Sequence, residues 1–338
     1  MTNHNSSQNP RRAQRNRYQN MTLLAIAVTF VSLLLVFAIL LGIGAVRAIR
    51  GDDPQNPNEG PENGDDQTPP EGDEPGEPDD GADDPNQNHQ QPPRVVSLPS
   101  ATINEGNLVL VNTTHVYTFP DVNLVNVYLS QATAQTLSKY FQMAGATLFM
   151  EQTAYTQMDK FLKAMNDPSV MFVSAHRTPE QQTASGSSIP AGYSDSHTGL
   201  SFALRGESAS GTPLPLTDQK YAWLYENCYK YGFVVRYPAD KVAQTGVSDY
   251  TNYFRYVGYV HAYLMTTKNL CLEEYIPYLQ SHTYGDGALK VTTDDGSSYE
   301  IYYVPATGTQ TQVPLPEHDN YTISGDNEGG FIVTVKVS

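Results

Sequence analysis

The segment Tyr250–Gly258 reads YTNYFRYVG, and Thr245-Gly246 stands just ahead of it. Four further blocks accompany this segment along the chain: SAHRTPEQQ (Ser174–Gln182), IPAGYSDSHTGLSFAL (Ile189–Leu204), YAWLYENCYKYGFVVRYP (Tyr221–Pro238) and LCLEEY (Leu270–Tyr275). The order and spacing of these five blocks indicate the fold class and place the candidate site.

The five blocks resemble the VanY-type D-alanyl-D-alanine carboxypeptidases, a family of zinc peptidases. That family carries segments close to SGYRSYEEQ, PPGYSEHQTGLAVDI, YGF-x-x-RYP, EPWHFRYVG and LTLEEY in the same order. In EPWHFRYVG the Glu is the general base and the His binds zinc. The resemblance implies an α+β fold, a VanY-like carboxypeptidase core in which helices pack on a small antiparallel sheet.

Aligned without gaps, the resemblance puts the three zinc-ligand positions at Ser196, Ala203 and Tyr253, and the base position at Tyr250. A zinc site of this class needs three protein ligands with N, O or S donors and a fourth position open for water. Serine, alanine and tyrosine cannot assemble such a site. We therefore expect no catalytic residue here, and we expect the family zinc to be absent.

A register shift does not restore the metal site. His197 and Asp195 flank Ser196, but the residue seven positions after His197 is Leu204 rather than a carboxylate. A slip of one residue in a strand also turns its side chains to the opposite face. We therefore interpret His176, His197 and His261 as surface or hydrogen-bonded histidines.

Three candidate substrate-binding residues follow from the resemblance: Arg177, Gln182 and Ser194. Arg177 matches an arginine that contacts the peptide substrate near its carboxyl end in the family, and a guanidinium fork suits a carboxylate bidentately. Ser194 matches the first serine of the Ser-x-His motif, and Gln182 matches the glutamine that closes the first block. The alternative for Arg177 is a structural salt bridge.

The N-terminal region predicts a membrane anchor. Residues 1–20 are polar and arginine-containing, and Thr22–Val46 runs without a charge for longer than the ~20 residues that cross a hydrocarbon core. A cleaved signal peptide would have a shorter apolar core and a small-residue cleavage site, whereas Arg47 follows here. We expect a cytoplasmic tail over 1–20 and one transmembrane helix over 21–49, with the C-terminal domain extracytoplasmic. The positive-inside rule favours this orientation moderately, because arginines flank both ends.

Residues 50–93 predict an acidic, proline-rich linker. Gly51–Pro93 contains fourteen Asp or Glu and no Lys or Arg. Such a segment has too little apolar surface to offset the entropy of ordering, so we expect a disordered tether. The linker accounts for most of the net charge of -16, and the remaining part of the chain is still acidic. This balance gives no support for nucleic-acid binding.

The folded part is expected to comprise a carboxypeptidase-like domain over 94–282 and a β-rich appendage over 283–338. Two helical stretches are expected within 134–165, the second with Ala154, Met158, Leu162 and Met165 on one buried face. Further elements are expected as strands at 171–174 and 233–237 and as helices at 219–231, 259–266 and 272–279. In the appendage, alternating runs over 299–304 and 331–337 between turn residues indicate strands.

Tyrosine is abundant, at 23 residues, which raises the possibility of carbohydrate binding through ring stacking. Most tyrosines of the five blocks are better interpreted as core residues. We expect Tyr250 and Tyr253 to fill the former metal cavity with their rings. Cys228 and Cys271 are expected to be buried free thiols, although a disulfide is permitted in an extracytoplasmic domain.

The sequence thus favours a membrane-anchored, catalytically inactive relative of bacterial cell-wall peptidases. Its expected partner is a peptidoglycan stem peptide or an envelope protein. One alternative is an active D,D-carboxypeptidase with atypical metal ligands. Another is a purely structural envelope interaction domain.

Overall fold

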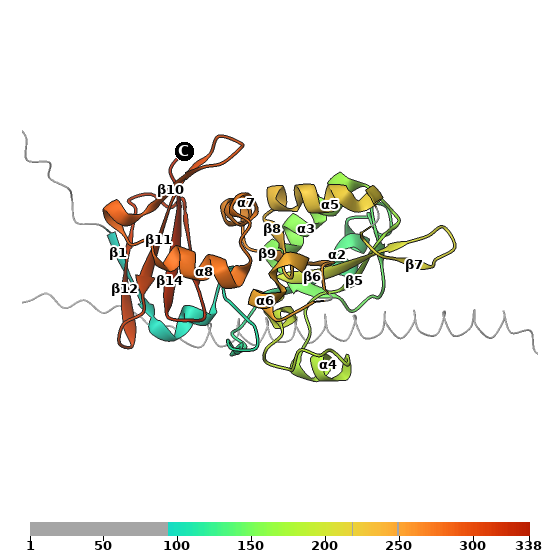
Figure 1. The fold of residues 1–338 in the computed structure, drawn as a ribbon, viewed down its shortest axis with the longest axis horizontal. Coiled ribbons are helices and arrows are strands. Elements are labelled where there is room, and N and C mark those ends of the chain that lie inside the picture. The colour runs from blue at the N-terminus through green and yellow to red at the C-terminus, as the bar shows by residue number, and fades with distance from the viewer. Residues whose placement is uncertain (1–93, 218, 249) are drawn as a thin grey trace, which may run out of the picture. The chain divides into compact units, whose positions relative to one another are not determined.

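The computed structural model describes residues 94–217, 219–248 and 250–338. The predicted cytoplasmic tail, membrane anchor and acidic linker lie outside these residues. Within them, no helix combines the length and apolar character needed to cross a membrane. Figure 1 shows the strands β10–β14 of the appendage beside the carboxypeptidase-like core, with α7 between them.

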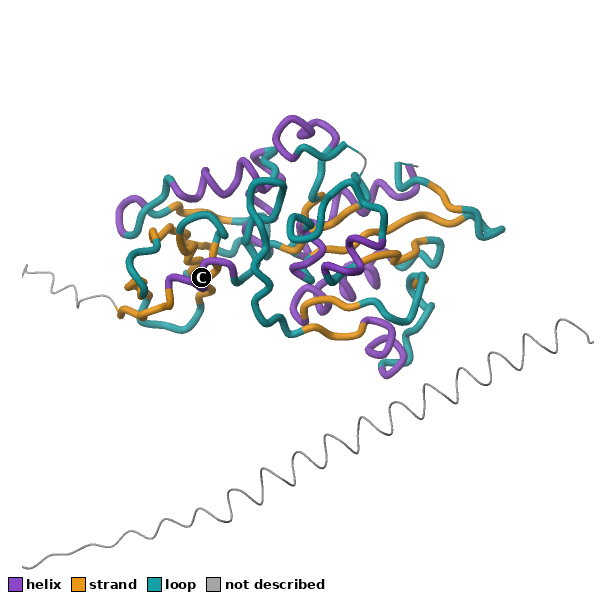
Figure 2. Tube along the Cα trace, turned by 90° about the horizontal axis from the view of Figure 1, so that it is seen from below, coloured by secondary structure: helices purple, strands orange, loops and turns teal. Residues whose placement is uncertain are grey.

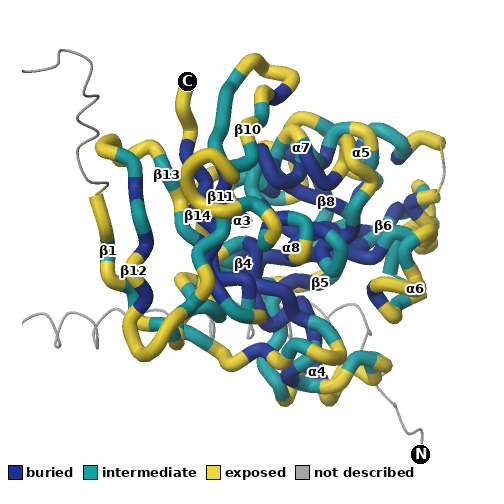
Figure 3. The backbone as a smooth tube through the Cα atoms, turned by 60° about the vertical axis from the view of Figure 1, so that its left-hand side comes forward, coloured by how far each residue is buried: buried dark blue, intermediate teal, exposed yellow. Residues whose placement is uncertain are grey.

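The core is built on one mixed sheet in the order β3-β5-β6-β9-β8, with the short β7 added beside β6. All its pairings are antiparallel except the one between β3 and β5. Its strands are β3 (Gln142–Met143), β5 (Val170–Ser174), β6 (Ser201–Glu207), β7 (Pro213–Leu214), β8 (Phe233–Val235) and β9 (Tyr253–Tyr256). The strands expected at 171–174 and 233–237 are therefore present. The buried backbone of β5, β6 and β8 runs through the middle of the molecule (Figure 3).

Figure 2 shows the helices in purple. They are α2 (Val127–Thr133), α3 (Gln152–Met165), α4 (Pro179–Ala184), α5 (Ala222–Asn227), α6 (Val242–Thr245), α7 (Tyr259–Lys268) and α8 (Leu272–Gln280). Side chains of α2, α3 and α5 share a buried cluster with this sheet, and α7 contacts β8. In α3 the expected face is confirmed, since Ala154, Met158 and Leu162 are buried and Met165 packs at the margin of the core. A two-stranded ladder of β2 (Leu124–Asn126) and β4 (Phe149–Glu151) precedes α3.

The first helical stretch expected within 134–165 was wrong. The helix α2 lies earlier and ends at Thr133, and Gln135 and Ser138 have positive φ angles of 55° and 57°. Residues with side chains rarely adopt this left-handed conformation, and it cannot continue an α-helix. The following residues form turns and the short strand β3 instead.

The expected β-rich appendage is a four-stranded antiparallel sheet in the order β10-β11-β14-β13. Its strands are β10 (Leu289–Thr292), β11 (Ser298–Pro305), β13 (Tyr321–Gly325) and β14 (Gly330–Lys336). One face of this sheet packs on α7 and α8 through Ile301 and Ile332, which share a buried cluster with Tyr275 and Leu279.

The other face is covered by a pair of strands, one from the beginning of the described chain and one from the appendage. The strand β1 (Arg94–Pro99) pairs antiparallel with β12 (Gln310–Leu315) over six residues. Local patterning assigned residues 94–99 to the preceding domain, because a pairing between distant segments leaves no periodic signal in either one. The appendage is therefore assembled from both sides of the carboxypeptidase-like core.

Candidate functional site

The positions matched to zinc ligands come together where β6 meets β9. Ala203 on β6 lies directly opposite Tyr253 on β9 in the antiparallel register. Directly opposed residues of this kind have Cβ atoms roughly 4.5–5.5 Å apart. Ser196 lies in the 3₁₀-helix Asp195–Thr198, just ahead of β6, and its side chain is close enough to the Tyr253 hydroxyl to counter part of the rise in that group's pKa. The gapless alignment therefore places these side chains around one point in space.

A pocket of ≈450 Å³ opens at this point. It is lined by Val173, Ser174, Arg177, Ser187, Ile189, Ser194, Ala203, Tyr237, Tyr250, Asn252 and Tyr253. The Tyr237 ring lies 5.9 Å from the Tyr253 ring and 6.3 Å from the Tyr250 ring, measured between centroids. Tyr250 and Tyr253 thus line the pocket but leave it open. The expectation that the two rings fill the cavity is corrected, because both residues line a pocket that keeps a volume of ≈450 Å³.

Arg177 is held in this pocket by neutral acceptors. Its Nη2 donates to Ser174 Oγ at 2.9 Å, and its Nη1 donates to Gln182 Oε1 at 3.2 Å. Among the described residues, no carboxylate forms an ion pair with Arg177. The salt-bridge alternative for this arginine therefore lacks a partner in the described chain. Arg177 is also the one formally charged side chain among the lining residues.

Gln182 lies behind Arg177 and does not line the pocket. Its side chain is buried, its Oε1 accepts from Arg177 and from Ser196 Oγ, and its Nε2 donates to the Ile189 carbonyl at 2.8 Å. Ser196 Oγ lies 2.7 Å from Ser194 Oγ. The hydroxyl at the first ligand position thus joins a hydrogen-bonded chain that ends on the guanidinium. In this arrangement Gln182 orients Arg177, and Ser194 and Arg177 face the open space.

The side chains present do not fit a zinc ion. Burial raises the pKa of Tyr253 far above its ordinary value, and the nearby Asp195 charge raises it further. The phenol therefore stays protonated at neutral pH, and Ser196 offers a hydroxyl already engaged in hydrogen bonds. Ala203 has no donor atom. Within residues 94–338, leaving aside 218 and 249, no group of three or more His, Cys, Asp and Glu is arranged to hold a metal ion.

The neighbouring histidine is tied into the backbone. His197 Nδ1 donates to the Arg177 carbonyl at 2.7 Å, and His197 Nε2 accepts from the Gly192 N–H at 3.0 Å. Both ring nitrogens are used, and burial lowers the pKa of His197. His261 is likewise hydrogen-bonded, to Tyr275 and Thr334 at 2.8 Å each. The interpretation of these two histidines as hydrogen-bonded is confirmed. Burial also lowers the pKa of His176, which keeps that ring neutral.

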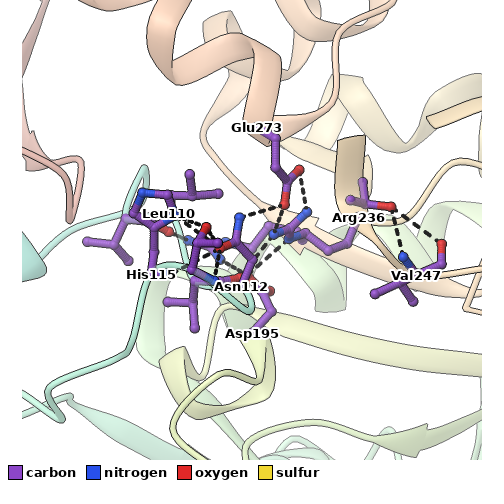
Figure 4. A network of polar contacts seen from close by, with 12 residues as sticks. Leu110, Asn112, His115, Asp195, Arg236, Val247 and Glu273 are labelled. Atoms are coloured by element: carbon purple, nitrogen blue, oxygen red, sulfur yellow. Dashed lines mark hydrogen bonds and ion pairs between the residues drawn. The ribbon is translucent and has the colours of Figure 1, made fainter. Parts of the chain in front are cut away.

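Sequence reasoning missed a buried ionic network directly beside the pocket. Arg236 Nε donates to Asp195 Oδ1 at 3.1 Å, and its two terminal nitrogens donate to the Glu273 carboxylate at 2.8 and 3.0 Å. Arg255 pairs with the same Asp195 oxygen. The side chains of Asp195, Arg236 and Arg255 have no solvent exposure, and Figure 4 shows Asp195, Arg236 and Glu273 of this network.

These four residues come from four of the five sequence blocks, namely GYSDSHTGL, RYP, FRYVG and LCLEEY. The available signal in the sequence was that each of these short blocks contains an arginine or a carboxylate. Two arginines and two carboxylates balance each other, as buried charges must. The network thus fixes the 3₁₀-helix that carries Ser194 and Ser196 against β8, β9 and α8.

The two cysteines take no part in the site. Cys228 and Cys271 are both free and buried, so the expectation of free thiols is confirmed and the disulfide does not form. Burial raises the pKa of each thiol to about 12. A thiol with such a pKa is protonated at neutral pH and is a poor nucleophile.

Comparisons with known proteins agree with this geometry. Residues 129–259 match the family model described as VanY, D-alanyl-D-alanine carboxypeptidase. A D-alanyl-D-alanine carboxypeptidase of Enterococcus faecium is 33% identical over 213 residues, which cover 62% of this chain and 62% of that protein. Another from Enterococcus faecalis (strain ATCC 700802 / V583) is 39% identical over 85 residues, covering 25% of this chain and 30% of that protein.

Among solved structures, the vancomycin resistance D,D-dipeptidase VanXYg in complex with a D-Ala-D-Ala phosphinate analog superposes with a TM-score of 0.63 and 27% identity. The superposition covers 72% of this chain and 98% of that chain. The chain is thus similar to VanY-type D-alanyl-D-alanine carboxypeptidases over part of its length, and the superposition agrees with a fold of mixed helices and sheets. The matches span 62% and 30% of these two relatives' own length, which is less than two thirds in both.

Proposed function

We propose that this chain is a D-alanyl-D-alanine carboxypeptidase-like protein that binds the carboxyl terminus of a peptidoglycan stem peptide without hydrolysing it. The observation that carries the proposal is Arg177, a cation that faces an open pocket with neutral acceptors around it and no carboxylate partner among the residues that the structure describes. The relatives named above act on or bind D-Ala-D-Ala according to their descriptions, which supports a peptide of this kind as the ligand.

The pocket suits a peptide carboxylate chemically. A guanidinium fork can donate two parallel hydrogen bonds to one carboxylate, and such charge-assisted bonds are stronger than neutral ones. Ser194 and the tyrosine hydroxyls add polar contacts at the rim, while Val173 and Ile189 offer an apolar wall for a small side chain. Because Gln182 and Ser174 already hold the guanidinium, a ligand would meet an oriented donor.

Replacing Arg177 by alanine is expected to weaken binding of a free-acid stem peptide by roughly ten- to a hundredfold. A charge-assisted contact of this type is typically worth about 1.5–3 kcal/mol. Amidating the carboxyl terminus of the peptide should have a similar effect on the wild-type protein. Calorimetric titration measures both, and Arg94→Ala serves as the control because Arg94 is an exposed arginine outside the pocket.

If neither peptide binds at millimolar concentration while the protein is folded, the peptide proposal fails. The alternative is then an interaction domain whose partner is an envelope protein. An active carboxypeptidase with atypical ligands is the other alternative. It requires stoichiometric zinc in the purified chain, together with release of D-alanine that a chelator abolishes.

We also propose that the protein is anchored in the cell membrane by residues 21–49, with its N-terminus in the cytoplasm and residues 94–338 outside. The long uncharged run and the acidic segment behind it support this arrangement. Protease added to intact protoplasts is expected to cut within residues 51–93 and to release a soluble fragment that begins near Arg94. Complete protection from the protease, or a secreted chain that begins near residue 48, would contradict the proposal.

A further inference from the structure

A second pocket, of ≈560 Å³, lies between the appendage sheet and the start of α7. It shares no lining residue with the pocket at Arg177. The core contributes the segments 106–108 and 256–261, and the appendage contributes Tyr299, residues 319–324, Thr334 and Lys336. We call this space the appendage cleft.

The register of the sheet determines which side chains face the appendage cleft. Tyr299 on β11 pairs with Lys336 on β14, and Thr322 on β13 pairs with Thr334 on β14. Since Thr334 and Lys336 are two residues apart on one strand, they point to the same face, and their partners point there too. Tyr299, Thr322, Thr334 and Lys336 therefore form one wall.

The first residues of α7, Tyr259 to His261, line the cleft on the side of the core. The Tyr259 hydroxyl donates to the Asp294 carboxylate in the β10–β11 turn, which fixes its ring at the start of the helix. His261 is buried between the two parts of the domain, bonded through one nitrogen to Thr334 Oγ1 of β14 and through the other to Tyr275 of α8. These bonds tie the appendage to the core, so the cleft is preformed and does not depend on closure around a ligand.

The hydrogen-bonding groups left open in the cleft are mainly neutral. Within the described chain, the side chains of Asn107, Tyr299, Asn320 and Thr322 have no hydrogen-bond partner. Each of them carries a hydroxyl or an amide, and these groups can both donate and accept. Asp319 and Lys336 are the lining residues with a formal charge, they have opposite signs, and Asp319 is paired with Arg94. The cleft therefore combines an aromatic ring with neutral donors and acceptors and has little net charge.

We propose that the appendage cleft binds an uncharged oligosaccharide with N-acetylated amino sugars. A ligand rich in hydroxyl and acetamido groups matches amide and hydroxyl side chains in both donor and acceptor roles. The Tyr299 ring offers an apolar surface for one face of a sugar ring. The volume lies in the range of sites for small ligands, which use aromatic walls and a few placed polar groups. This site is distinct from the peptide pocket and goes beyond the function proposed above.

The experiment is a calorimetric titration of the full-length chain with tri-N-acetylchitotriose, a probe that contains no peptide and no carboxylate. We expect binding that Tyr299→Ala weakens by at least roughly tenfold. The paired exposed variant Asn320→Ala/Thr322→Ala should weaken it severalfold without loss of folding, because neither side chain is buried. Arg177→Ala should leave the affinity unchanged, which separates this proposal from the peptide site.

Cellotriose, which lacks the acetamido groups, should bind more weakly than the chitin trimer. Equal affinity for the two trimers would contradict the N-acetyl preference. Absence of binding by the folded wild-type protein at millimolar concentrations would overturn the proposal. So would binding that neither the Tyr299 variant nor the paired variant changes.

Discussion

Asp195→Asn is expected to lower the free energy of unfolding by about 3–5 kcal/mol, the usual cost of removing one partner from a buried ion pair. The substitution keeps the shape of the side chain and deletes its charge. Arg236 and Arg255 would then face each other without solvent exposure, with Glu273 as the remaining carboxylate of the network. The cost arises mainly from leaving a buried guanidinium unpaired.

Asp319→Asn is the matched control. Asp319 also pairs with an arginine, but both side chains are largely exposed, and such a surface pair contributes about 0–1 kcal/mol. Urea unfolding of the two variants, followed by circular dichroism, measures the difference. A loss of less than about 1 kcal/mol for Asp195→Asn would show that the network does not stabilise the fold in the way proposed here.

The same network predicts acid sensitivity. Burial alone would raise the pKa of Asp195 and of Glu273, but the neighbouring arginines outweigh burial and lower both below their ordinary values of 3.8 and 4.5. The unfolded chain then binds more protons than the folded chain in this range, so stability rises with pH. The contribution is fully present above the ordinary values and is lost as pH falls through the lowered ones. In Asp195→Asn this acid-dependent loss should be smaller.

The sequence predicted the parts of the molecule whose signal is local or is carried by a motif. The buried face of α3 followed from spacing, and Ser196, Ala203 and Tyr253 followed from an alignment without gaps, since β6 and β9 are each fixed by a motif. The strand β1 could not be predicted, because nothing near Arg94 identifies Leu315 as its partner. The helix expected near residue 134 does not form, because Gln135 and Ser138 adopt left-handed backbone conformations. Glutamine and serine give no strong sequence signal for this conformation.

The role of the charged residues in the shared blocks was not predicted from the sequence. Arg236, Arg255 and Glu273 stand in blocks that resemble a family of enzymes, but the resemblance gave no role to these three residues. In the structure these residues form buried ion pairs with Asp195 and with one another. A chain can therefore keep the RYP, FRYVG and LEEY blocks for stability alone, whatever happens at the ligand positions.

If the shared blocks stabilise the fold independently of the ligand positions, restoring the ligands should restore a metal site. The largest effect we expect is therefore a gain of zinc binding. The variant Ser196→His/Ala203→Asp/Tyr253→His places two imidazoles and a carboxylate at three positions that converge. Ala203 lies opposite Tyr253 in the sheet, and the Ser196 side chain lies close enough to the Tyr253 hydroxyl to influence its pKa. Imidazole and carboxylate are ordinary zinc ligands, and three of them leave a fourth position open for water. We expect one zinc per chain in this variant and none in the wild type after the same dialysis.

Zinc content by mass spectrometry and thermal unfolding with and without zinc measure the gain. Zinc at about a thousandfold over its Kd should add about 4 kcal/mol to the stability of the variant. The control Ser196→His/Tyr253→His keeps Ala203, has two ligands, and should bind zinc far more weakly. Adding Tyr250→Glu to the triple variant places a glutamate at the position where the resembled family has its general base. This variant should release D-alanine from a pentapeptide, and a chelator should abolish the release. A triple variant that folds but binds no zinc would show that the three positions do not converge. Zinc bound by the wild type would show that its ligands lie at other positions, and the non-catalytic proposal would then be wrong.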